Sequence, residues 1–220
     1  ELVEQWESEK YTFGILTASE GTIYERFGFG PACFANSVSL SPGAQMRAAQ
    51  PDDATVRYAD ADAVAAAIPD LHARWTLTTP GALTRTPAWW NPILADRASE
   101  RPLSASGLHY LLHADGYASY RIYKDETGAV RGEVNEVFAV TDDAHTDLWR
   151  VLISLDLIPS LTATIPVDDP LSQKLVNPRS VSVTGTADTM WLRILDVPAA
   201  LGARHYAADL DAVIEVTDEF

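Results

Sequence analysis

The sequence predicts a mixed α/β (α+β) fold, because segments with strand periodicity alternate with segments of helical periodicity along the chain. Apolar residues recur at helical spacing between Asp60 and Arg74, and again in the stretch that follows Asp142. Apolar and β-branched runs mark strands, and the Asp115-Gly116 pair between two of them is typical of a hairpin. With 220 residues, of which 47% are hydrophobic, the chain is long enough to bury a substantial core in one or two domains.

The first forty residues predict a compact strand–helix–strand unit behind an initial helix. Leu2, Val3 and Trp6 have helical spacing, and the Gly and Pro residues of 27–31 end a second, shorter helix. The expected elements are a helix over 1–10, a buried strand over 11–17, a short helix over 22–27 and a strand over 33–40. The polar stretch 41–54 that follows is expected to be a linker.

Residues 55–168 predict a second, larger unit. Its expected elements are a strand over 55–58, a helix over 60–74, a loop over 76–87, a short helix ending near Arg97, strands over 107–114, 116–124 and 130–141, a helix over 142–155 and a strand over 160–167. Acidic residues at 142 and 143 suit the start of a helix. Beyond a boundary between Pro166 and Ser180, we expect a Thr/Gly/Asp segment, a strand over 190–195, a helix over 198–204 and a final strand over 213–216.

The balance of charges excludes some classes of partner. Sixteen Lys and Arg residues stand against thirty-one Asp and Glu residues, which gives a formal net charge of −15. This charge repels nucleic-acid phosphates and anionic lipids and favours cationic ligands, although an acidic surface also serves solubility alone. No apolar run approaches the ~20 residues that cross a bilayer, and no basic and then apolar leader opens the chain. The single cysteine, Cys33, rules out an internal disulfide, so we expect a cytoplasmic protein. The charge and the lack of a membrane-spanning run lead us to expect no nucleic-acid or membrane partner.

Several motifs of catalysis and ligand binding are absent from the sequence. His109 and His113 lie four residues apart in a predicted strand, which separates them by about 13 Å and prevents them from sharing a metal ion. The other histidines have no ligand partner at a suitable spacing, so no metal site is expected. No serine lies in a Gly-x-Ser-x-Gly motif. Gly28 and Gly30 do not begin a dinucleotide fingerprint, because Cys33 replaces the third glycine and a strand follows.

Three runs of residues resemble the Eis (enhanced intracellular survival) family of GNAT-type acetyltransferases. Residues 17–32, Thr-Ala-Ser-Glu-Gly-Thr-Ile-Tyr-Glu-Arg-Phe-Gly-Phe-Gly-Pro-Ala, are similar to the run that closes the family's first acetyltransferase fold. Residues 140–156 are similar to a helix of its second fold. Residues 190–206, which begin Met-Trp-Leu-Arg-Ile-Leu-Asp-Val-Pro, resemble the entry to its C-terminal sterol-carrier-like domain.

The resemblance implies a GNAT-type mixed sheet with flanking helices and four segments. These are the end of a first GNAT fold over 1–40, a linker over 41–54, a second and degenerate GNAT fold over 55–168, and the start of a sterol-carrier-like domain over 180–220. Both ends are then expected to lie within a longer chain. Family members form rings of subunits, so the resemblance also implies a homo-oligomer, specifically a hexamer.

The same resemblance implies a function. The parent enzyme is expected to transfer an acetyl group from acetyl-CoA to a primary amine of an aminoglycoside or a lysine-like acceptor. Tyr24 aligns with the family tyrosine that protonates the departing CoA thiolate, and Ser19 and Glu20 are expected with it at the cofactor. A phenol suits this task, because it is mostly protonated at neutral pH and can donate to a developing thiolate. Without the surrounding motif, a tyrosine on a short helix would be interpreted as a packing residue.

One departure from the family pattern limits this interpretation. The family's acetyl-CoA loop follows Arg/Gln-x-x-Gly-x-Gly/Ala, in which backbone N–H groups at a helix start hold the pyrophosphate. No Arg or Gln of this sequence has a Gly three residues later. The main cofactor loop is therefore expected outside this chain, and the chain alone is expected to be inactive. The alternative is a non-catalytic module that binds a small molecule or lipid, with aromatic surface from Trp75, Trp89, Trp90 and Trp191, although tryptophans are more often core and interface residues.

Overall fold

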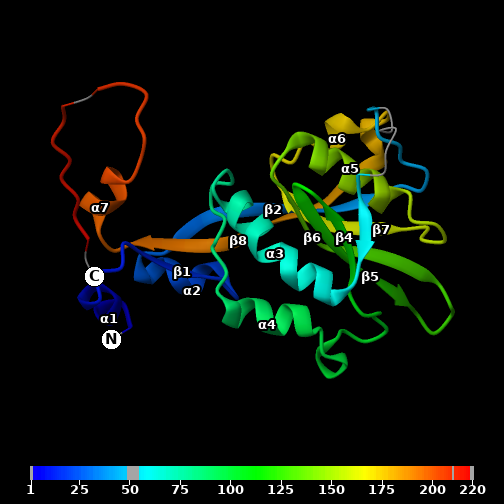
Figure 1. Cartoon of the computed structure of the whole chain (residues 1–220). Helices are drawn as coiled ribbons and strands as arrows, with labels where there is room; N and C mark the ends of the chain where they lie inside the picture. The colour runs from blue at the N-terminus through cyan, green and yellow to red at the C-terminus, as the bar shows by residue number, and fades with distance from the viewer. Residues whose placement is uncertain (1, 49–54, 210, 219–220) are drawn as a thin grey trace. The chain divides into compact units, whose positions relative to one another are not determined.

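The computed structural model describes residues 2–48, 55–209 and 211–218 (Figure 1). The chain forms two compact units, and each is described by itself. Unit 1 combines the two ends of the sequence, up to Phe34 and from Ala187 onward, and unit 2 comprises Ala35–Thr186. Two long strands, β2 (Gly30–Leu40) and β8 (Val181–Ile194), contribute residues to both units.

Unit 2 contains a mixed sheet with the strand order β8-β2-β7-β6-β5-β4-β3. Its further strands are β3 (Arg57–Ala59), β4 (His109–His113), β5 (Gly116–Lys124), β6 (Val130–Ala139) and β7 (Leu161–Pro166). β6 and β7 are parallel, whereas the pairs β2–β7, β5–β6, β4–β5 and β3–β4 are antiparallel. The parallel pair requires a crossover, and helix α5 (Asp142–Ile153) provides it.

Helices cover both faces of this sheet. Helices α3 (Ala61–Thr76) and α4 (Pro87–Ala95) pack on one face, where Val64, Ile68 and Trp90 contact strand residues such as Tyr117. Figure 1 shows these two helices in front of the strands. On the other face, α5 and α6 (Leu171–Lys174) form the larger core, whose fully buried side chains include Leu148, Trp149 and Leu171. The alternation of side chains along the strands supplies both cores.

The predicted helix starts and hairpin are confirmed, with one shift. Asp60 caps α3 by accepting a hydrogen bond from the Ala63 N–H at 2.8 Å, and Thr141 caps α5. The hairpin between β4 and β5 pairs His113 with Gly116, so the turn spans His113 to Gly116 as expected, with Ala114 and Asp115 at its centre; the predicted first strand, 107–114, extends one residue too far. Two short 3-10 helices, η2 (Ala98–Glu100) and η3 (Pro178–Ser180), complete unit 2.

Unit 1 is smaller and contains α1 (Leu2–Ser8), β1 (Phe13–Leu16), α2 (Gly21–Tyr24), the 3-10 turn η1 (Glu25–Phe27) and α7 (Val197–Gly202). Strand β1 pairs antiparallel with the end of β8, from Phe13 opposite Ile194 to Leu16 opposite Trp191. α7 begins where Asp196 accepts a hydrogen bond from the Ala199 N–H at 2.9 Å.

Three expectations about the elements are wrong. The Thr/Gly/Asp segment after Ser180 is not irregular but belongs to the 14-residue strand β8. The predicted final strand over 213–216 is absent, since residues 211–218 have no regular structure and Val213 is fully exposed, without a neighbouring strand to bond its backbone. Strand β1 is shorter than expected and is not buried, because Phe13 and Ile15 are exposed.

The predicted linker and domain division can be compared with the packing. Residues 41–48 belong to unit 2, where Ala44 is buried and Met46 bridges to Leu175, while 49–54 lie outside the described residues. The division into segments 1–40, 41–54, 55–168 and 180–220 stays a prediction, as does the sterol-carrier-like assignment of the last one.

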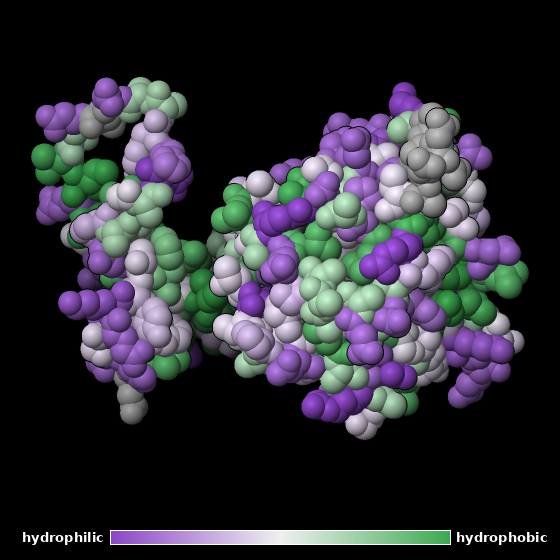
Figure 2. All heavy atoms as spheres, in the orientation of Figure 1, coloured by the Kyte–Doolittle hydropathy of each residue, from purple (hydrophilic) through white to green (hydrophobic). Residues whose placement is uncertain are grey.

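The described residues meet neither the requirements for a membrane-spanning helix nor those for a metal site. Within the described ranges, no helix combines the length and apolar character needed to cross a bilayer, and no group of His, Cys, Asp and Glu has the arrangement of a metal site. Figure 2 shows hydrophilic side chains over much of the visible face of unit 2, with hydrophobic ones between them.

Candidate active site around Tyr24

Tyr24 lies where the short helix α2 passes into the turn η1. Its backbone carbonyl accepts a hydrogen bond from the Phe29 N–H at 3.3 Å, and the Gly28 N–H donates to the Glu25 carbonyl at 2.9 Å. Gly28 has a φ of 75°, in the left-handed region that glycine adopts without steric cost. The run that carries the family resemblance therefore folds as a tight reversal directly after Tyr24, where Phe27 and Phe29 follow it in sequence.

The Tyr24 side chain lines a cavity of about 500 Å³ that lies within unit 1. Most of the wall is apolar, and its apolar members are Leu2, Val3, Trp6, Leu16, Phe27 and Phe29. The Tyr24 side chain is half-buried, and its hydroxyl has no hydrogen-bond partner among the residues that the structure describes. A phenol hydroxyl can both donate and accept, so this group is available to a ligand in the cavity.

Arg193 fixes the backbone behind this cavity. Its side chain comes from β8, is only 3% exposed and also lines the cavity. Its Nη1 donates to the Phe27 carbonyl at 2.5 Å, and its Nη2 pairs with Asp218 at 3.1 Å. A Cβ at Gly28 would lie 2.6 Å from Nη1, so the turn after Tyr24 and the guanidinium are fitted closely to each other.

The opposite wall depends on a second glycine. Gly14 of β1 lies in register with Arg193, and a Cβ there would lie 2.8 Å from the Trp6 ring. The missing side chain lets Trp6 of α1 pack flat against β1, close to Phe29. The first helix thereby becomes a wall of the Tyr24 cavity.

The two other predicted cofactor residues lie apart from the cavity. Ser19 and Glu20 are exposed in the bend before α2, and Glu20 stands at the N-terminus of that helix without a capping hydrogen bond from its side chain. Neither residue lines the cavity that contains Tyr24. Their contact with acetyl-CoA stays a prediction.

The structure also indicates why unit 2 is a poor place for a pyrophosphate. Helix α5 begins directly after β6, but its first turn carries Asp142 and Asp143, and the Thr141 hydroxyl already accepts from the Ala144 N–H. Lys174 lies 2.6 Å from Asp142 and lowers the pKa of that carboxyl by its hydrogen bond. Helix N-termini bind phosphate through free N–H groups and positive potential, and two ionised carboxylates oppose both.

The catalytic role that the sequence suggested for Tyr24 stays a prediction, and the sequence analysis did not predict that Arg193 and Trp6 line the same cavity. A signal for Arg193 was present, because it is the one charged residue within the apolar run Met190–Leu195 of a predicted strand. Trp6 has helical spacing in the sequence, but its contact with β1 depends on Gly14, whose packing is not visible there.

Comparisons with known proteins agree with this architecture. Residues 81–194, about half of the chain, match the model of a family described as an acetyltransferase (GNAT) domain. N-acetyltransferase Eis of Mycobacterium tuberculosis is 37% identical over 216 residues, which cover 94% of this chain and 53% of that protein. An uncharacterized N-acetyltransferase of Streptomyces griseus is 32% identical over 225 residues, with 93% and 53% covered.

Solved structures give the same result. The crystal structure of Eis1 from Mycobacterium abscessus matches with a TM-score of 0.74 at 31% identity, over 93% of this chain and 53% of that one. A GCN5-related N-acetyltransferase from Anabaena variabilis matches with a TM-score of 0.75 at 18% identity, over 96% and 53%, which is a likeness of fold.

The chain spans about half the length of the curated relatives it matches. The expected α/β class, with a mixed sheet and flanking helices, is confirmed by the sheet of unit 2 and by these neighbours. The family model, the sequence relatives and the Eis1 structure all point the same way, so the chain belongs to the GNAT acetyltransferases, in the group that includes the Eis proteins.

Proposed function

We propose that these residues belong to an acetyl-CoA-dependent N-acetyltransferase that acts on primary amines of aminoglycoside or lysine-like acceptors. The observation that supports it most is the placement of Tyr24, since a phenol without a hydrogen-bond partner among the described residues lines an apolar cavity of about 500 Å³. Acetyl-CoA, when bound, supplies the activated thioester. The protein as a whole is proposed to be a cytoplasmic homo-oligomer, a hexamer as in the family it resembles.

In this proposal Tyr24 protonates the CoA thiolate as it leaves. The apolar wall of Trp6, Phe27 and Phe29 suits the thioester end of the cofactor and excludes water from it, which strengthens a hydrogen bond from the phenol. Arg193 acts through the backbone, because its bond to the Phe27 carbonyl holds the turn that follows Tyr24. The residues around the cavity thus fit the acyl end of acetyl-CoA, whereas the pyrophosphate needs N–H groups that α5 does not offer.

The test is acetyl transfer to an aminoglycoside, followed by release of the CoA thiol, in the longest polypeptide that contains these residues. Tyr24→Phe keeps the ring and removes the acid, and we expect kcat to fall about 10²-fold or more with little change in folding. Tyr11→Phe is the matched control, because Tyr11 is 54% exposed in the same unit and does not line the Tyr24 cavity. Undiminished turnover by Tyr24→Phe would exclude Tyr24 as the acid.

A second candidate function is a non-catalytic module that binds a small molecule or lipid. The same apolar cavity favours it, because it would accept a hydrophobic group without any chemistry. Calorimetry with acetyl-CoA on the same polypeptide separates the two candidates, since the module predicts no heat of binding while the enzyme predicts saturable binding.

A further inference from the structure

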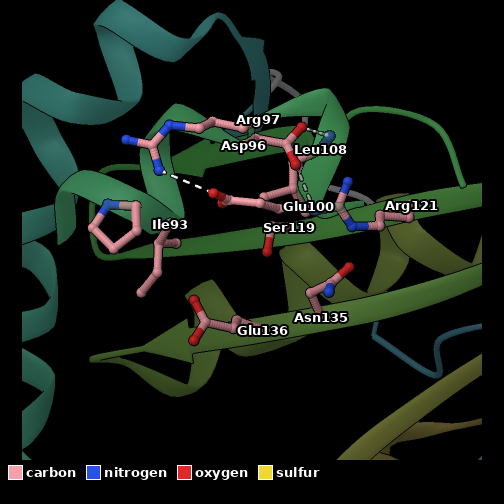
Figure 3. Close-up of a pocket in the computed structure, with 10 residues that line it drawn as sticks. Ile93, Asp96, Arg97, Glu100, Leu108, Ser119, Arg121, Asn135 and Glu136 are labelled. Atoms are coloured by element: carbon pink, nitrogen blue, oxygen red, sulfur yellow. Dashed lines mark hydrogen bonds and ion pairs between the residues drawn. The ribbon is translucent and has the colours of Figure 1, made fainter. Parts of the chain in front are cut away.

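A second cavity, of about 350 Å³, lies within unit 2 between α4 and the strands β5 and β6 (Figure 3). None of its lining residues takes part in the Tyr24 cavity. The volume is that of a site for a small molecule. Its wall is unusual for a small cavity, because charged side chains of both signs line it from the segment 96–100 after α4 and from β5 and β6.

A β-bulge turns two polar residues of β6 toward this cavity. Ser119 of β5 pairs with Glu136, but the next residue of β5 pairs with Val134, so Asn135 is the extra residue of the bulge. Val134 and Val137 pack in the core on the α5 side, which leaves Asn135 and Glu136 together on the other face. Figure 3 shows both side chains on β6 at the edge of the cavity. Without the bulge, strict alternation would turn the Glu136 carboxylate into the apolar core, and bulges commonly re-aim side chains at functional sites.

The cationic side of the cavity is rigid. Arg121 is 9% exposed, and its Nη2 donates to Asp96 Oδ1 at 2.5 Å while its Nη1 donates to the Ser106 carbonyl at 2.8 Å. Asp96 also accepts from the Leu108 N–H at 2.8 Å and pairs with Arg101, so both of its carboxylate oxygens are bonded within the protein. These bonds leave guanidinium N–H groups of Arg121 for another acceptor, since the group has five donors.

The anionic side is equally fixed. Glu136 Oε1 accepts from Arg85 Nη2 at 2.5 Å, and the Arg85 guanidinium lies over the rings of Trp90 and Phe138 at 4.8 and 5.3 Å. The Glu136 side chain is 22% exposed, and an ionised carboxylate accepts about four hydrogen bonds. Arg85 Nη1 and the Tyr117 hydroxyl also donate to Glu136 Oε2, at 3.3 and 3.5 Å. About one acceptor site of Glu136 therefore remains toward the cavity, beside the exposed amide of Asn135.

A buried tyrosine hydroxyl on the same face of the sheet as Ser119 also lacks a hydrogen-bond partner among the described residues. Tyr110 of β4 pairs in register with Ser119, so both side chains stand on the same face of the sheet. The Tyr110 hydroxyl is buried and has no hydrogen-bond partner in the described part of the chain. Buried polar groups without a partner are rare in native proteins and commonly indicate a missing water or ligand.

We propose that this cavity binds a free α-amino acid or another zwitterion of that size. The ligand carboxylate contacts Arg121, and the ligand ammonium group contacts Glu136 and Asn135. Arg121 stands two residues along β5 from Ser119, the register partner of Glu136, which separates the two ends of the site by about 7 Å along the strands. An ammonium and a carboxylate group on one carbon, each with a hydrogen bond of about 3 Å, span such a gap. A lone anion would face the Glu136 carboxylate, and a lone cation would face Arg121.

The test is an NMR titration of the ¹⁵N-labelled chain with L-serine, with acetate and methylamine as probes that carry one charge each. We expect saturable shifts of the Ser119 and Asn135 amides with L-serine at millimolar concentration, and none of that size with acetate or methylamine. Glu136→Gln should weaken L-serine binding at least about tenfold, which corresponds to about 1.4 kcal/mol. Glu133→Gln is the matched control, because Glu133 lies on the same strand, binds Arg131 and does not line the cavity.

Several results would overturn the proposal. They are the absence of saturable shifts with L-serine, equal shifts with acetate alone, or equal weakening by Glu136→Gln and Glu133→Gln. Thermal unfolding of each variant shows whether it is folded. If Glu136→Gln fails to fold, Asn135→Ala takes its place, since Asn135 is exposed and makes no side-chain hydrogen bond within the described residues, and it must weaken L-serine binding for the proposal to stand.

Discussion

His72 lies on α3 in the core of unit 2, and its protonation is expected to destabilise that unit. The residue is 3% exposed, and its ring centroid lies 5.5, 5.2 and 5.0 Å from those of Trp75, Trp90 and Phe138. Burial removes the water that would solvate an imidazolium, and the nearby Arg85 guanidinium repels it. Together they lower the pKa of His72 from 6.5 to about 4.

The direction of the pH effect follows from this shift. Because the folded state holds the neutral imidazole, it binds the proton less well than the unfolded chain does. The contribution of His72 to stability is therefore fully present above pH 6.5 and is lost as the pH falls toward 4. A pKa difference of this size lowers the free energy of unfolding by about 2 kcal/mol at pH 5 and by about 3 kcal/mol at the acid limit.

Urea unfolding of the chain, followed by tryptophan fluorescence between pH 7.5 and pH 5, measures this loss. Trp75 and Trp90 report on the region directly, because both rings contact His72. His72→Phe keeps an aromatic ring in the same pocket and cannot titrate, so its free energy of unfolding should fall by about 2 kcal/mol less over this range than that of the parent chain. His72→Leu serves as a second non-titrating variant in case the phenyl ring overpacks the site. Equal pH slopes for the parent chain and both variants would refute the reasoning.

Three other changes test the packing, each by chemical denaturation. Gly28→Ala places a Cβ against Arg193 at a positive φ, and we expect a loss of at least about 1 kcal/mol together with a weaker hold on the turn after Tyr24. Leu171→Ala, at a fully buried position of α6, should cost about 2–5 kcal/mol, whereas Leu157→Ala, at a side chain that is 85% exposed, should change stability by less than about 0.5 kcal/mol. Thr141→Ala removes the cap of α5 and should cost about 1 kcal/mol; no loss would mean that the cap is dispensable.

The elements that the sequence predicted well carry their own local signals. α3 and α5 have an apolar stripe and a capping residue each, and the structure places both within about two residues of the expected bounds. The strand over 213–216 had alternation alone, and alternation forms a strand only where a neighbour bonds its backbone. Conversely, the segment 181–189 has Thr and Gly residues that suggested a loop, but its neighbours in the sheet make it part of β8.

The candidate site likewise contains residues with a local sequence signal and residues without one. Tyr24 could be identified from the sequence because a long local run resembles a known family. Arg193 reaches the same cavity from the far end of the chain, and no local pattern connects it with Tyr24. The bulge at Asn135 could not be predicted either, because it is a mismatch between two strands, and neither strand carries it alone.

The family match and the proposed chemistry concern different parts of the chain. The match covers 81–194, which includes strand β6 and the helix α5 that follows it. Here the helix starts with a Thr cap and two carboxylates, and a phosphate charge about 4 Å from a carboxylate is repelled by about 1 kcal/mol even in water and by more near a protein surface. Unit 2 thus has a sheet like that of the family, whereas the carboxylates in the first turn of α5 repel a phosphate group. The sheet persists because its two apolar cores stabilise it without any ligand. The proposed function therefore places acetyl transfer around Tyr24, outside the matched range, and the further proposal assigns a different small molecule to the bulged strand of unit 2.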